Sequence, residues 1–451
     1  MNIHFIGIGG IGVSALAHYE LSRGNTVSGS DLTESEITKA LREKGAMIQI
    51  GEGKVPEDTE RVVFSPAVQA DHEERQEASK RQIPQMSYPE ALGELTKTHY
   101  TVAISGTHGK STTTAMIGIL LTKAGLDPTV IVGTKLKEFG NTNCRVGKGQ
   151  IQGKSFGTAQ DLRPLLVIEA DEYAESFLHY YPDVIVLTSL EADHLDYYKT
   201  FENVTRAFTE YLSHLDSAGI IVANGDDANI RTLVEKKERV HFTSLSQKEA
   251  ETLKRILKIP GAHNVSNALA ALETARILGV PDEISTHTLS EYTGSWRRFE
   301  VFALKDYTLV SDYGHHPTEV QVTVEAAREK WPEKKLWLVF QPHQYDRTWR
   351  FFDDFARILS GLPVHKLLLA PIYDVAGREN TEAKAAVSSE KLLHAIQQRS
   401  PKAEEARAFS TLEETEMYVR EHIQGGEIVI IMGAGNIYSV ACSLIDRSSQ
   451  E

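Results

Sequence analysis

The sequence predicts an α/β protein of three domains, each built on a mainly parallel sheet. Short apolar strands alternate with helical segments along the chain, which is the rhythm of parallel strands joined by crossover helices. This rhythm starts three times, at Met1, at Tyr100 and after Trp296. The chain of 451 residues is also too long for one ordinary core and fits roughly three domains of about 150 residues.

The predicted domains are residues 1–98, 99–295 and 296–451. In the first, the runs HFIGI and TVSGSD are strand-like and each precedes a helical segment. In the second, YTVAIS leads into a glycine turn and a helix. LLVIEADE and DVIVLTS contain the continuous apolar runs typical of buried parallel strands and end in polar residues. The third domain contains RRFEVFALKDYTLVSDYG, KKLWLVFQPH, HKLLLAPIYD and EIVIIMGAGN, with helical stretches between them. We expect the ends of the middle-domain strands to line a site.

Composition argues against several classes of protein. A net charge of -14 without a clustered basic segment argues against a nucleic-acid binder, because phosphate neutralisation needs grouped basic residues. No segment approaches the roughly 20 apolar residues of a membrane helix, and the apolar N-terminus lacks the basic start of a signal peptide. Only two cysteines, Cys144 and Cys442, are present, which fits a reducing compartment. We therefore expect a cytoplasmic protein with no membrane or nucleic-acid partner, as a monomer or weak homodimer.

The first candidate site is the glycine-rich turn from Gly7 to Gly12, between a strand and a helix. Glycines let the backbone approach a pyrophosphate, and the helix N-terminus favours the anion. Asp31 closes the next strand, where an acid meets a ribose hydroxyl or a base. The pattern does not distinguish NAD from a UDP-sugar, and a structural turn without a ligand is the alternative. The residues assigned to this site are Gly7, Gly9, Gly10, Ile11, Gly12 and Asp31.

The second candidate site is the turn that begins at Gly106, again between a strand and a helix. Its backbone N–H groups would cradle phosphates, Lys110 would offset charge at the β and γ positions, and the Ser111 hydroxyl would reach Mg²⁺. The turn is a variant of G-x-x-x-x-G-K-[ST], because Ile104 stands at the first glycine position. ATP binding is assigned to Gly106, Thr107, His108, Gly109, Lys110, Ser111 and Thr112.

Acidic residues and a histidine follow two strands of the middle domain. Glu169 and Glu172 come after one strand and His194 after the next. Hard divalent cations prefer oxygen ligands, and a neutral imidazole can join them where Mn²⁺ replaces Mg²⁺. Parallel strands deliver their ends to one crevice, which favours Ser111, Glu169 and His194 as metal ligands. A structural role for His194 is the alternative.

A third polar cluster opens an alanine-rich helix and consists of His263, Asn264 and Asn267. Asparagines at this position either cap the helix or contact adenine, and both interpretations remain open.

In their order along the chain, these segments resemble those of the Mur ligases, which join an amino acid or peptide to a UDP-sugar carboxylate during peptidoglycan synthesis. The shared segments are G-T-x-G-K-[ST], E-A-D-E, D-H-x-D, H-N-x-x-N and an arginine before F-E, which begin here at Gly106, Glu169, Asp193, His263 and Arg298. The resemblance covers nearly the whole chain. It implies a Rossmann-like UDP-sugar domain, a P-loop ATPase-type middle domain and a Rossmann-like C-terminal domain that binds the amino acid.

Within the family, the third domain is similar to that of members that add L-alanine to UDP-N-acetylmuramate. Ser311 to Glu319 and Phe340 to Thr348 resemble their D-D-Y-x-H-H-P-T-E and F-Q-P-H-R-Y-x-R-T segments. The chain departs from the pattern at Gln344, where an arginine is typical. Members that attach a murein tripeptide stay open as the alternative, because the stretch from Gly133 to Gly140 looks closer to theirs.

The resemblance also implies a mechanism and a set of roles. The sugar carboxylate attacks the γ-phosphate of ATP, and the amine of alanine then attacks the resulting acyl phosphate, with Mg²⁺ or Mn²⁺ as the metal. The expected catalytic residues are Lys110, His108, Glu169, His194 and Arg298. The expected ATP contacts outside the turn are His263, Asn264, Asn267, Arg298 and Asp312, Ser65 would bind the UDP-sugar, and Tyr313, His315 and Arg347 would bind the amino acid.

Two other classes of function are kept as alternatives. A nicotinamide oxidoreductase would use the turn from Gly7 to Gly12 but leaves the turn at Gly106 unexplained. A nucleotide-regulated binding protein without ligase activity would have no need of Lys110, Glu169 and His194 together.

Overall fold

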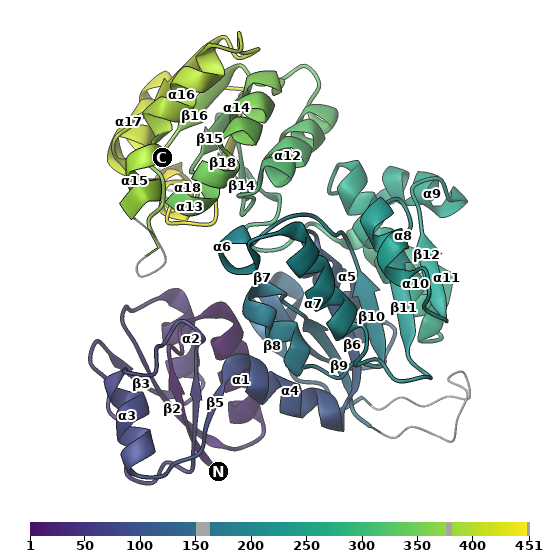
Figure 1. The fold of residues 1–451 in the computed structure, drawn as a ribbon. Coiled ribbons are helices and arrows are strands. Elements are labelled where there is room, and N and C mark those ends of the chain that lie inside the picture. Colours follow the sequence, from purple (N-terminus) through teal and green to yellow (C-terminus); the bar gives the residue numbers. More distant parts are fainter. Residues whose placement is uncertain (150–162, 376–380, 449–451) are drawn as a thin grey trace. The chain divides into compact units, whose positions relative to one another are not determined.

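Three α/β domains, each with its own sheet, confirm the predicted fold class. The computed structural model describes residues 1–149, 163–375 and 381–448 (Figure 1). The chain forms two compact units. The first unit comprises Met1–Asp193, Thr200–Leu253 and Ser266–Glu291, and the second comprises His194–Lys199, Lys254–Val265 and Tyr292–Glu451. The first unit thus holds the first two sheets, and the second unit holds the third; the exact domain boundaries stay a prediction.

The first sheet is fully parallel in the order β3-β2-β1-β4-β5. Its strands are β1 (Asn2–Ile6), β2 (Thr26–Asp31), β3 (Met47–Ile50), β4 (Arg61–Phe64) and β5 (Gln85–Ser87). Its helices are α1 (Ile11–Ser22), α2 (Glu36–Glu43), α3 (Glu73–Lys80) and α4 (Tyr88–Thr98). The strand order reverses beside β1, so the turn after β1 opens at the point where α/β sheets usually bind ligands.

The middle sheet has the order β12-β11-β10-β6-β9-β7-β8 and is parallel except for the β7–β8 hairpin. Its strands are β6 (Tyr100–Ser105), β7 (Thr129–Leu136), β8 (Thr142–Arg145), β9 (Leu165–Glu169), β10 (Val184–Leu187), β11 (Ile220–Asn224) and β12 (Val240–Thr243). The accompanying helices are α5 (Lys110–Lys123), α6 (Leu195–Tyr198), α7 (Phe201–Tyr211), α8 (Ala228–Val234), α9 (Lys248–Ile256), α10 (Ala262–Ile277) and α11 (Asp282–Glu291), with short 3₁₀ turns at Lys137–Phe139 and Tyr173–His179. Strand β6 lies between β9 and β10, so their carboxyl ends surround the turn that follows β6.

The third sheet has the order β13-β14-β18-β15-β16-β17, with β13 antiparallel to β14. Its strands are β13 (Glu300–Ala303), β14 (Thr308–Asp312), β15 (Leu336–Phe340), β16 (Lys366–Leu369), β17 (Glu405–Ala408) and β18 (Ile428–Met432). Its helices are α12 (Pro317–Lys330), α13 (Tyr345–Arg350), α14 (Phe352–Gly361), α15 (Thr381–Ala386), α16 (Ser389–Gln397), α17 (Leu412–His422) and α18 (Tyr438–Ser448).

Strand β18 explains why both faces of the third sheet are covered. Ile428, Ile430 and Met432 pack into a core with α12, α14 and α16, whereas Val429 and Ile431 pack into a second core with α17 and α18. Successive side chains of a strand point to opposite faces, so a continuous apolar run needs helices on both sides.

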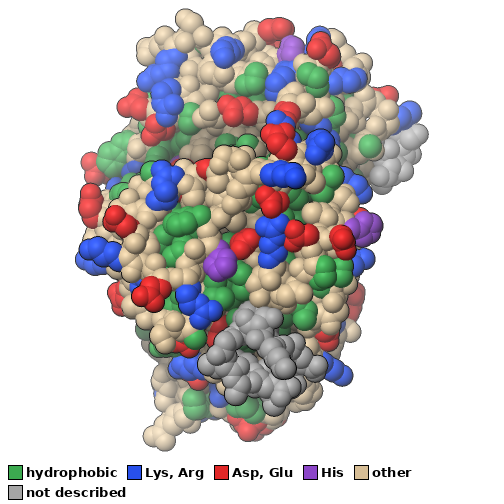
Figure 2. Space-filling model, turned by 90° about the vertical axis from the view of Figure 1, so that its right-hand side faces the viewer, with side chains coloured by type: hydrophobic (Ala, Val, Ile, Leu, Met, Phe, Trp, Pro, Cys, Tyr) green, Lys and Arg blue, Asp and Glu red, His purple; other side chains and the backbone are tan. Residues whose placement is uncertain are grey.

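Charged side chains of both signs lie on the face of the molecule that Figure 2 shows. On the face that Figure 2 shows, the coloured basic side chains are interspersed with acidic ones rather than joined into one basic surface. Among the described residues, no helix has the length and apolar character needed to cross a bilayer. Cys144 and Cys442 are both outside any disulfide.

Ile104 shows why the turn after β6 departs from the common phosphate-loop pattern. It is fully buried within β6, in register with Val186 of β10 and Glu169 of β9. We predict that Ile104→Ala lowers the free energy of unfolding by about 3 kcal/mol, because it leaves a cavity in the core. Urea denaturation followed by circular dichroism measures this. The matched control is Ile284→Ala, whose side chain is exposed on α11 and should cost less than about 0.5 kcal/mol; equal losses would contradict the core role of Ile104.

Candidate active site

The turn between β6 and α5 can be built only with glycine at two positions. Gly106 has φ +133° and a Cβ there would lie 2.3 Å from the hydroxyl of Thr188. Gly109 has φ +83° and a Cβ there would lie 2.5 Å from Oδ1 of Asn267. Helix α5 then begins with Lys110, Ser111 and Thr112, so its first N–H groups face the turn. This is the backbone arrangement that the sequence predicted for ATP phosphates.

Residues that follow β10 form hydrogen bonds to this turn, and the sequence did not identify them as site residues. The N–H of His108 donates to the Ser189 hydroxyl at 2.8 Å, and the N–H of Thr107 donates to the Ser189 carbonyl at 2.9 Å. The Thr107 hydroxyl accepts from the N–H of Glu191 at 2.9 Å. His108 Nε2 also lies 3.5 Å from a carboxylate oxygen of Glu191. The polar run after the apolar strand was the available signal, but it does not show which residue meets the turn.

Lys110 is anchored as a buried cation. Its ammonium donates to the Gly106 carbonyl and to a carboxylate oxygen of Glu172, each at 2.7 Å. Burial acts to lower the pKa of Lys110, but the carboxylates of Glu172, Asp171 and Glu169 outweigh it and hold the pKa above its ordinary value. Lys110 therefore carries its charge at any working pH. Glu172, considered with the metal ligands in the sequence, is the partner of this lysine.

Glu169 is oriented at both oxygens. Ser111 donates its hydroxyl to Oε1 at 2.9 Å, and the backbone N–H of Gly133 donates to Oε2 at 2.7 Å. A hydroxyl and a carboxylate at the N-terminus of α5 form a set of hard oxygen donors, which suits Mg²⁺. The residues present therefore fit a magnesium ion beside the phosphate turn.

The turn after β1 is shaped by Asp31. The N–H of Gly9 donates to Oδ2 of Asp31 at 2.8 Å, and a Cβ on Gly9 would lie at that same distance from Oδ2. Gly7 has φ +76°, and a Cβ there would lie 3.0 Å from the Cβ of Ser65. Asp31 and Ser65 therefore both lie at the turn, and their contact with a UDP-sugar stays a prediction. Asp31 has a structural task there in addition to its expected contact with the UDP-sugar.

Tyr88 is a residue of this region that the sequence did not single out. A Cβ on Gly12, in the first turn of α1, would lie 2.8 Å from the Tyr88 ring. Burial, with the nearby carboxylates of Glu169 and Asp171, raises the pKa of Tyr88 well above its ordinary value. Tyr88 is therefore a neutral hydroxyl beside Gly12, close enough to Glu169 and Asp171 of the middle domain to feel their charge.

In the second unit, Asp312 is buried at the end of β14. Its oxygens accept the backbone N–H of Gly314 at 2.7 Å and of Phe299 at 2.8 Å. The guanidinium of Arg298 lies 4.9 Å from the centre of the Tyr313 ring, and that ring lies 5.5 Å from the His315 ring. Four of the predicted residues thus gather at the end of one strand.

Arg347 and His194 form a second group within this unit. Nη2 of Arg347 lies 3.4 Å from Nδ1 of His194, and the arginine is buried. Gln344 precedes α13 with φ +66°, a left-handed backbone that glutamine rarely adopts. His194 belongs to the second unit and Ser111 and Glu169 to the first. A joint metal site of these three residues therefore stays a prediction.

The asparagines of α10 separate into two roles. Asn264 donates its side-chain amide to the Pro260 carbonyl at 2.7 Å, which stabilises the start of the helix. Asn267 instead lies against Gly109 in the phosphate turn. Burial lowers the pKa of His263 to about 4, so this imidazole is neutral. Of the three residues, Asn267 is the one placed beside the turn in the first unit.

Family models match the chain in three consecutive segments. Residues 2–100 match "Mur ligase family, catalytic domain", residues 104–257 match "Mur ligase middle domain", and residues 297–435 match "Mur ligase, glutamate ligase domain". The first and third segments contain the whole of the first and third sheets, and the second contains the middle sheet except for most of β6.

Individual relatives extend over the full length. The chain is 39% identical to UDP-N-acetylmuramate–L-alanine ligase of Aquifex aeolicus, over 96% of this chain and 95% of that one. It is 37% identical to the ligase of the same name from Alkaliphilus metalliredigens, over 98% and 97% of the two chains. The crystal structure of UDP-N-acetylmuramate-alanine ligase from Thermotoga maritima matches with a TM-score of 0.81 at 26% identity, covering 100% and 99% of the chains. A murein peptide ligase from Psychrobacter arcticus shares the fold, with a TM-score of 0.70 at 22% identity over 100% and 99% of the chains.

Asp312 should make the second unit less stable as the pH rises. Burial raises its pKa to about 6, although Arg298 and the two backbone N–H groups oppose the shift. Between about pH 4 and 6 the folded form then binds more protons than the unfolded form, so stability is present below this window and is lost through it. A rise of about two units corresponds to about 3 kcal/mol.

The measurement is urea denaturation followed by tryptophan fluorescence, because Trp296, Trp331, Trp337 and Trp349 all lie in the second unit. Asp312→Asn, which does not titrate, should lack this part of the pH dependence. Parallel pH profiles for the two proteins would show that Asp312 titrates at its ordinary value.

Proposed function

The chain belongs to the Mur ligase family, and on that premise we propose that it joins L-alanine to the lactyl carboxylate of UDP-N-acetylmuramate, with conversion of ATP to ADP and phosphate. The observation that carries this proposal is the cluster of Lys110, Ser111 and Glu169 at the N-terminus of α5. It supplies the cation, the backbone donors and the metal ligands that phosphoryl transfer needs. The similarity to alanine-adding ligases over 96% of the chain supports the choice of amino acid.

The central physical problem is that the sugar carboxylate and the ATP phosphates repel one another. Lys110 would place a permanent positive charge at the β and γ phosphates, where charge accumulates during transfer. To do so, its ammonium would exchange the Gly106 carbonyl for a phosphate oxygen while Glu172 keeps it protonated. The backbone N–H groups of Lys110 and Ser111 would hold the phosphate chain at the helix N-terminus.

The metal would be held by Ser111 and Glu169, with His194 as the further proposed ligand. Mg²⁺ held by these residues would neutralise negative charge at the ATP phosphates. Because the Gly133 N–H already fixes one oxygen of Glu169, the other oxygen and the Ser111 hydroxyl need little rearrangement to face a cation.

Binding of the UDP-sugar, the amino acid and the rest of ATP is assigned to separate elements. The turn from Gly7 to Gly12, with Asp31 and Ser65, would hold the UDP-sugar. Tyr313, His315 and Arg347 would orient the alanine or the acyl phosphate, and Arg298 would meet ATP. Asp312, Asn267, Asn264 and His263 are proposed for the ribose and adenine ends, and His108 for a phosphate or the acyl group. We also propose a cytoplasmic location, because the chain has only two cysteines and neither is in a disulfide. The oligomeric state, monomer or weak homodimer, stays a prediction.

Attachment of the murein tripeptide is the second candidate. The observation that favours it is the stretch from Gly133 to Gly140, which looks closer to the tripeptide ligases. In the structure this stretch lies in β7 and its turn, next to Glu169.

A comparison of acceptors tests the proposed activity. Purified protein with ATP, Mg²⁺ and UDP-N-acetylmuramate is assayed for phosphate release with L-alanine, glycine, L-serine or the tripeptide L-alanyl-γ-D-glutamyl-meso-diaminopimelate. We expect L-alanine to give a kcat/KM at least about 100-fold above glycine's or the tripeptide's, since a pocket built for one acceptor discriminates by several kcal/mol. Preference for the tripeptide would establish the second candidate instead, and phosphate release with none of them would refute ligation.

Removal of the Lys110 charge should stop the chemistry without preventing sugar binding. We predict that Lys110→Ala lowers kcat by at least about 10³-fold, because a charged donor to the transferred phosphoryl group is lost. Binding of UDP-N-acetylmuramate, measured by calorimetry, should stay unchanged.

Two further variants make this test specific. Lys110→Ala leaves the buried Glu172 carboxylate without its cation, which itself destabilises the fold. The double variant Lys110→Ala with Glu172→Gln removes that charge and should be equally inactive. Lys123→Ala, at the exposed far end of α5, is the matched control and should keep full activity. Ligation by the double variant would remove Lys110 from the mechanism.

A further inference from the structure

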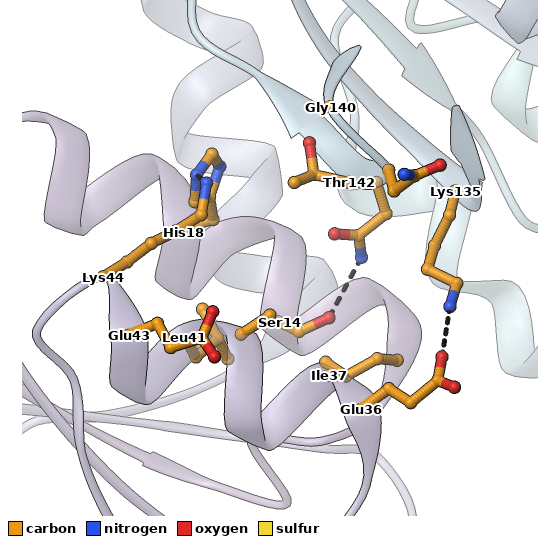
Figure 3. Close-up of a pocket in the computed structure, with 13 residues that line it drawn as sticks. Ser14, His18, Glu36, Ile37, Leu41, Glu43, Lys44, Lys135, Gly140 and Thr142 are labelled. Atoms are coloured by element: carbon orange, nitrogen blue, oxygen red, sulfur yellow. Dashed lines mark hydrogen bonds and ion pairs between the residues drawn. The ribbon is translucent and has the colours of Figure 1, made fainter. Parts of the chain in front are cut away.

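The β7–β8 hairpin forms one edge of the middle sheet and contacts the first domain. Helix α1 packs against both strands of the hairpin, within the first unit. Figure 3 shows Lys135, Gly140 and Thr142 of the hairpin opposite Ser14 and His18 of α1 and Glu36 and Leu41 of α2. This contact joins the domain proposed to bind the UDP-sugar to the domain proposed to bind ATP.

One buried polar contact anchors the hairpin to the start of α1. The side-chain amide of Asn143 donates to the Ile11 carbonyl and, at 3.0 Å, to the Ser14 hydroxyl. The Ser14 hydroxyl in turn donates to the Ile11 carbonyl at 2.9 Å. Asn143 and Ser14 are only 7% and 1% exposed, so these bonds lie in a largely buried setting, at the wall of a cavity.

The rest of this contact is weaker. Lys135 and Glu36 form an ion pair at 2.7 Å, but the Glu36 side chain is 77% exposed, and such pairs contribute little. A cavity of about 320 Å³ lies beside them, lined by His18, Ile37 and Lys44 among others. Apolar packing therefore does not fill the part of the interface around this cavity, and Asn143 supplies the buried polar contact there.

The same hairpin also reaches the ATP turn. Gly133, in β7, donates its N–H to Glu169, and Glu169 accepts from Ser111 in the first turn of α5. A single hairpin therefore contacts the first turn of α1 through Asn143 of β8 and the proposed metal carboxylate through Gly133 of β7. In the hairpin register these two residues lie close to the Ile131–Cys144 pair, so both contacts come from the same part of the hairpin. Both helix starts are the proposed phosphate-binding ends.

We propose that Asn143 is a positioning residue that sets the distance between the UDP-sugar and ATP by fixing the first turn of α1 to the β7–β8 hairpin. This inference rests on the proposed function. Asn143 touches neither substrate in this role. It keeps the two proposed anion-binding turns at a fixed distance and orientation, so that the sugar carboxylate meets the γ-phosphate in a reactive geometry.

The test compares kcat with the dissociation constants of the two substrates. In Asn143→Ala we expect kcat to fall by about 10- to 100-fold, since misplacement by about 1 Å costs up to about 100-fold. Calorimetric dissociation constants for UDP-N-acetylmuramate and for the Mg²⁺ complex of a β,γ-imido ATP analogue should stay within about threefold of wild type, because each site remains intact in its own domain.

Ser14→Ala is the second variant, and it tests the same contact even if Asn143→Ala fails to fold. It removes one of the two acceptors of Asn143 and should lower kcat by about three- to tenfold. The double variant should be no slower than Asn143→Ala alone, because both substitutions break one shared contact. If each substitution instead lowered kcat through a separate loss of stability, the fold-losses of the two single variants would multiply in the double variant.

Arg145→Ala is the matched control from the same face of β8. Arg145 donates to the Pro128 carbonyl at 2.7 Å and pairs with Asp127, so its contacts stay inside the middle domain. Its kcat should stay within about twofold of wild type. A kcat in Asn143→Ala and Ser14→Ala equal to that of wild type would overturn the positioning role, as would a loss that appears equally in either dissociation constant. A wild-type protein that fails to ligate L-alanine would refute the proposed function itself.

Discussion

A parallel strand that runs through a glycine turn into a helix leaves the first N–H groups of that helix unpaired, and the design of this chain follows from that constraint. It operates after β1 and after β6, in the two sheets of the first unit. At both turns, neighbouring side chains brace the backbone: Asp31 accepts from Gly9, and Ser189 accepts from His108. In the proposed function, the two phosphate chains would therefore be bound mainly by backbone N–H groups, and the charged side chains would act at the reacting end.

The parts of this design that depend on local pattern could be predicted from the sequence. Apolar runs give the strands, and a glycine turn before a helix gives the phosphate site, because both signals lie within a few neighbouring residues. Roles set by distant contacts could not be predicted. Glu169 and Glu172 are chemically identical and three residues apart, yet the first meets Ser111 and the second meets Lys110. Asn143 reads as an ordinary polar residue of a hairpin, because its partner Ile11 lies far away in the sequence.

In the second unit, two arginines lie against the rings of other predicted site residues. Arg298 lies over the Tyr313 ring, and Arg347 lies beside the His194 imidazole. The backbone at Gln344 occupies the left-handed region and is fixed by its N–H bond to the Tyr373 carbonyl at 2.9 Å. The departure from the family pattern at this position therefore sits in a constrained turn, where the shape of the backbone matters as well as the side chain.

The β7–β8 hairpin has one more consequence, for the behaviour of fragments of this protein. In the described part of the chain, β8 is the outermost strand of the middle sheet, and an outermost strand offers unpaired backbone groups to any other chain. Here α1 packs against that hairpin. The first domain thus covers part of this hairpin through α1. A truncated middle domain produced without the first domain would be prone to self-association through the exposed edge strand.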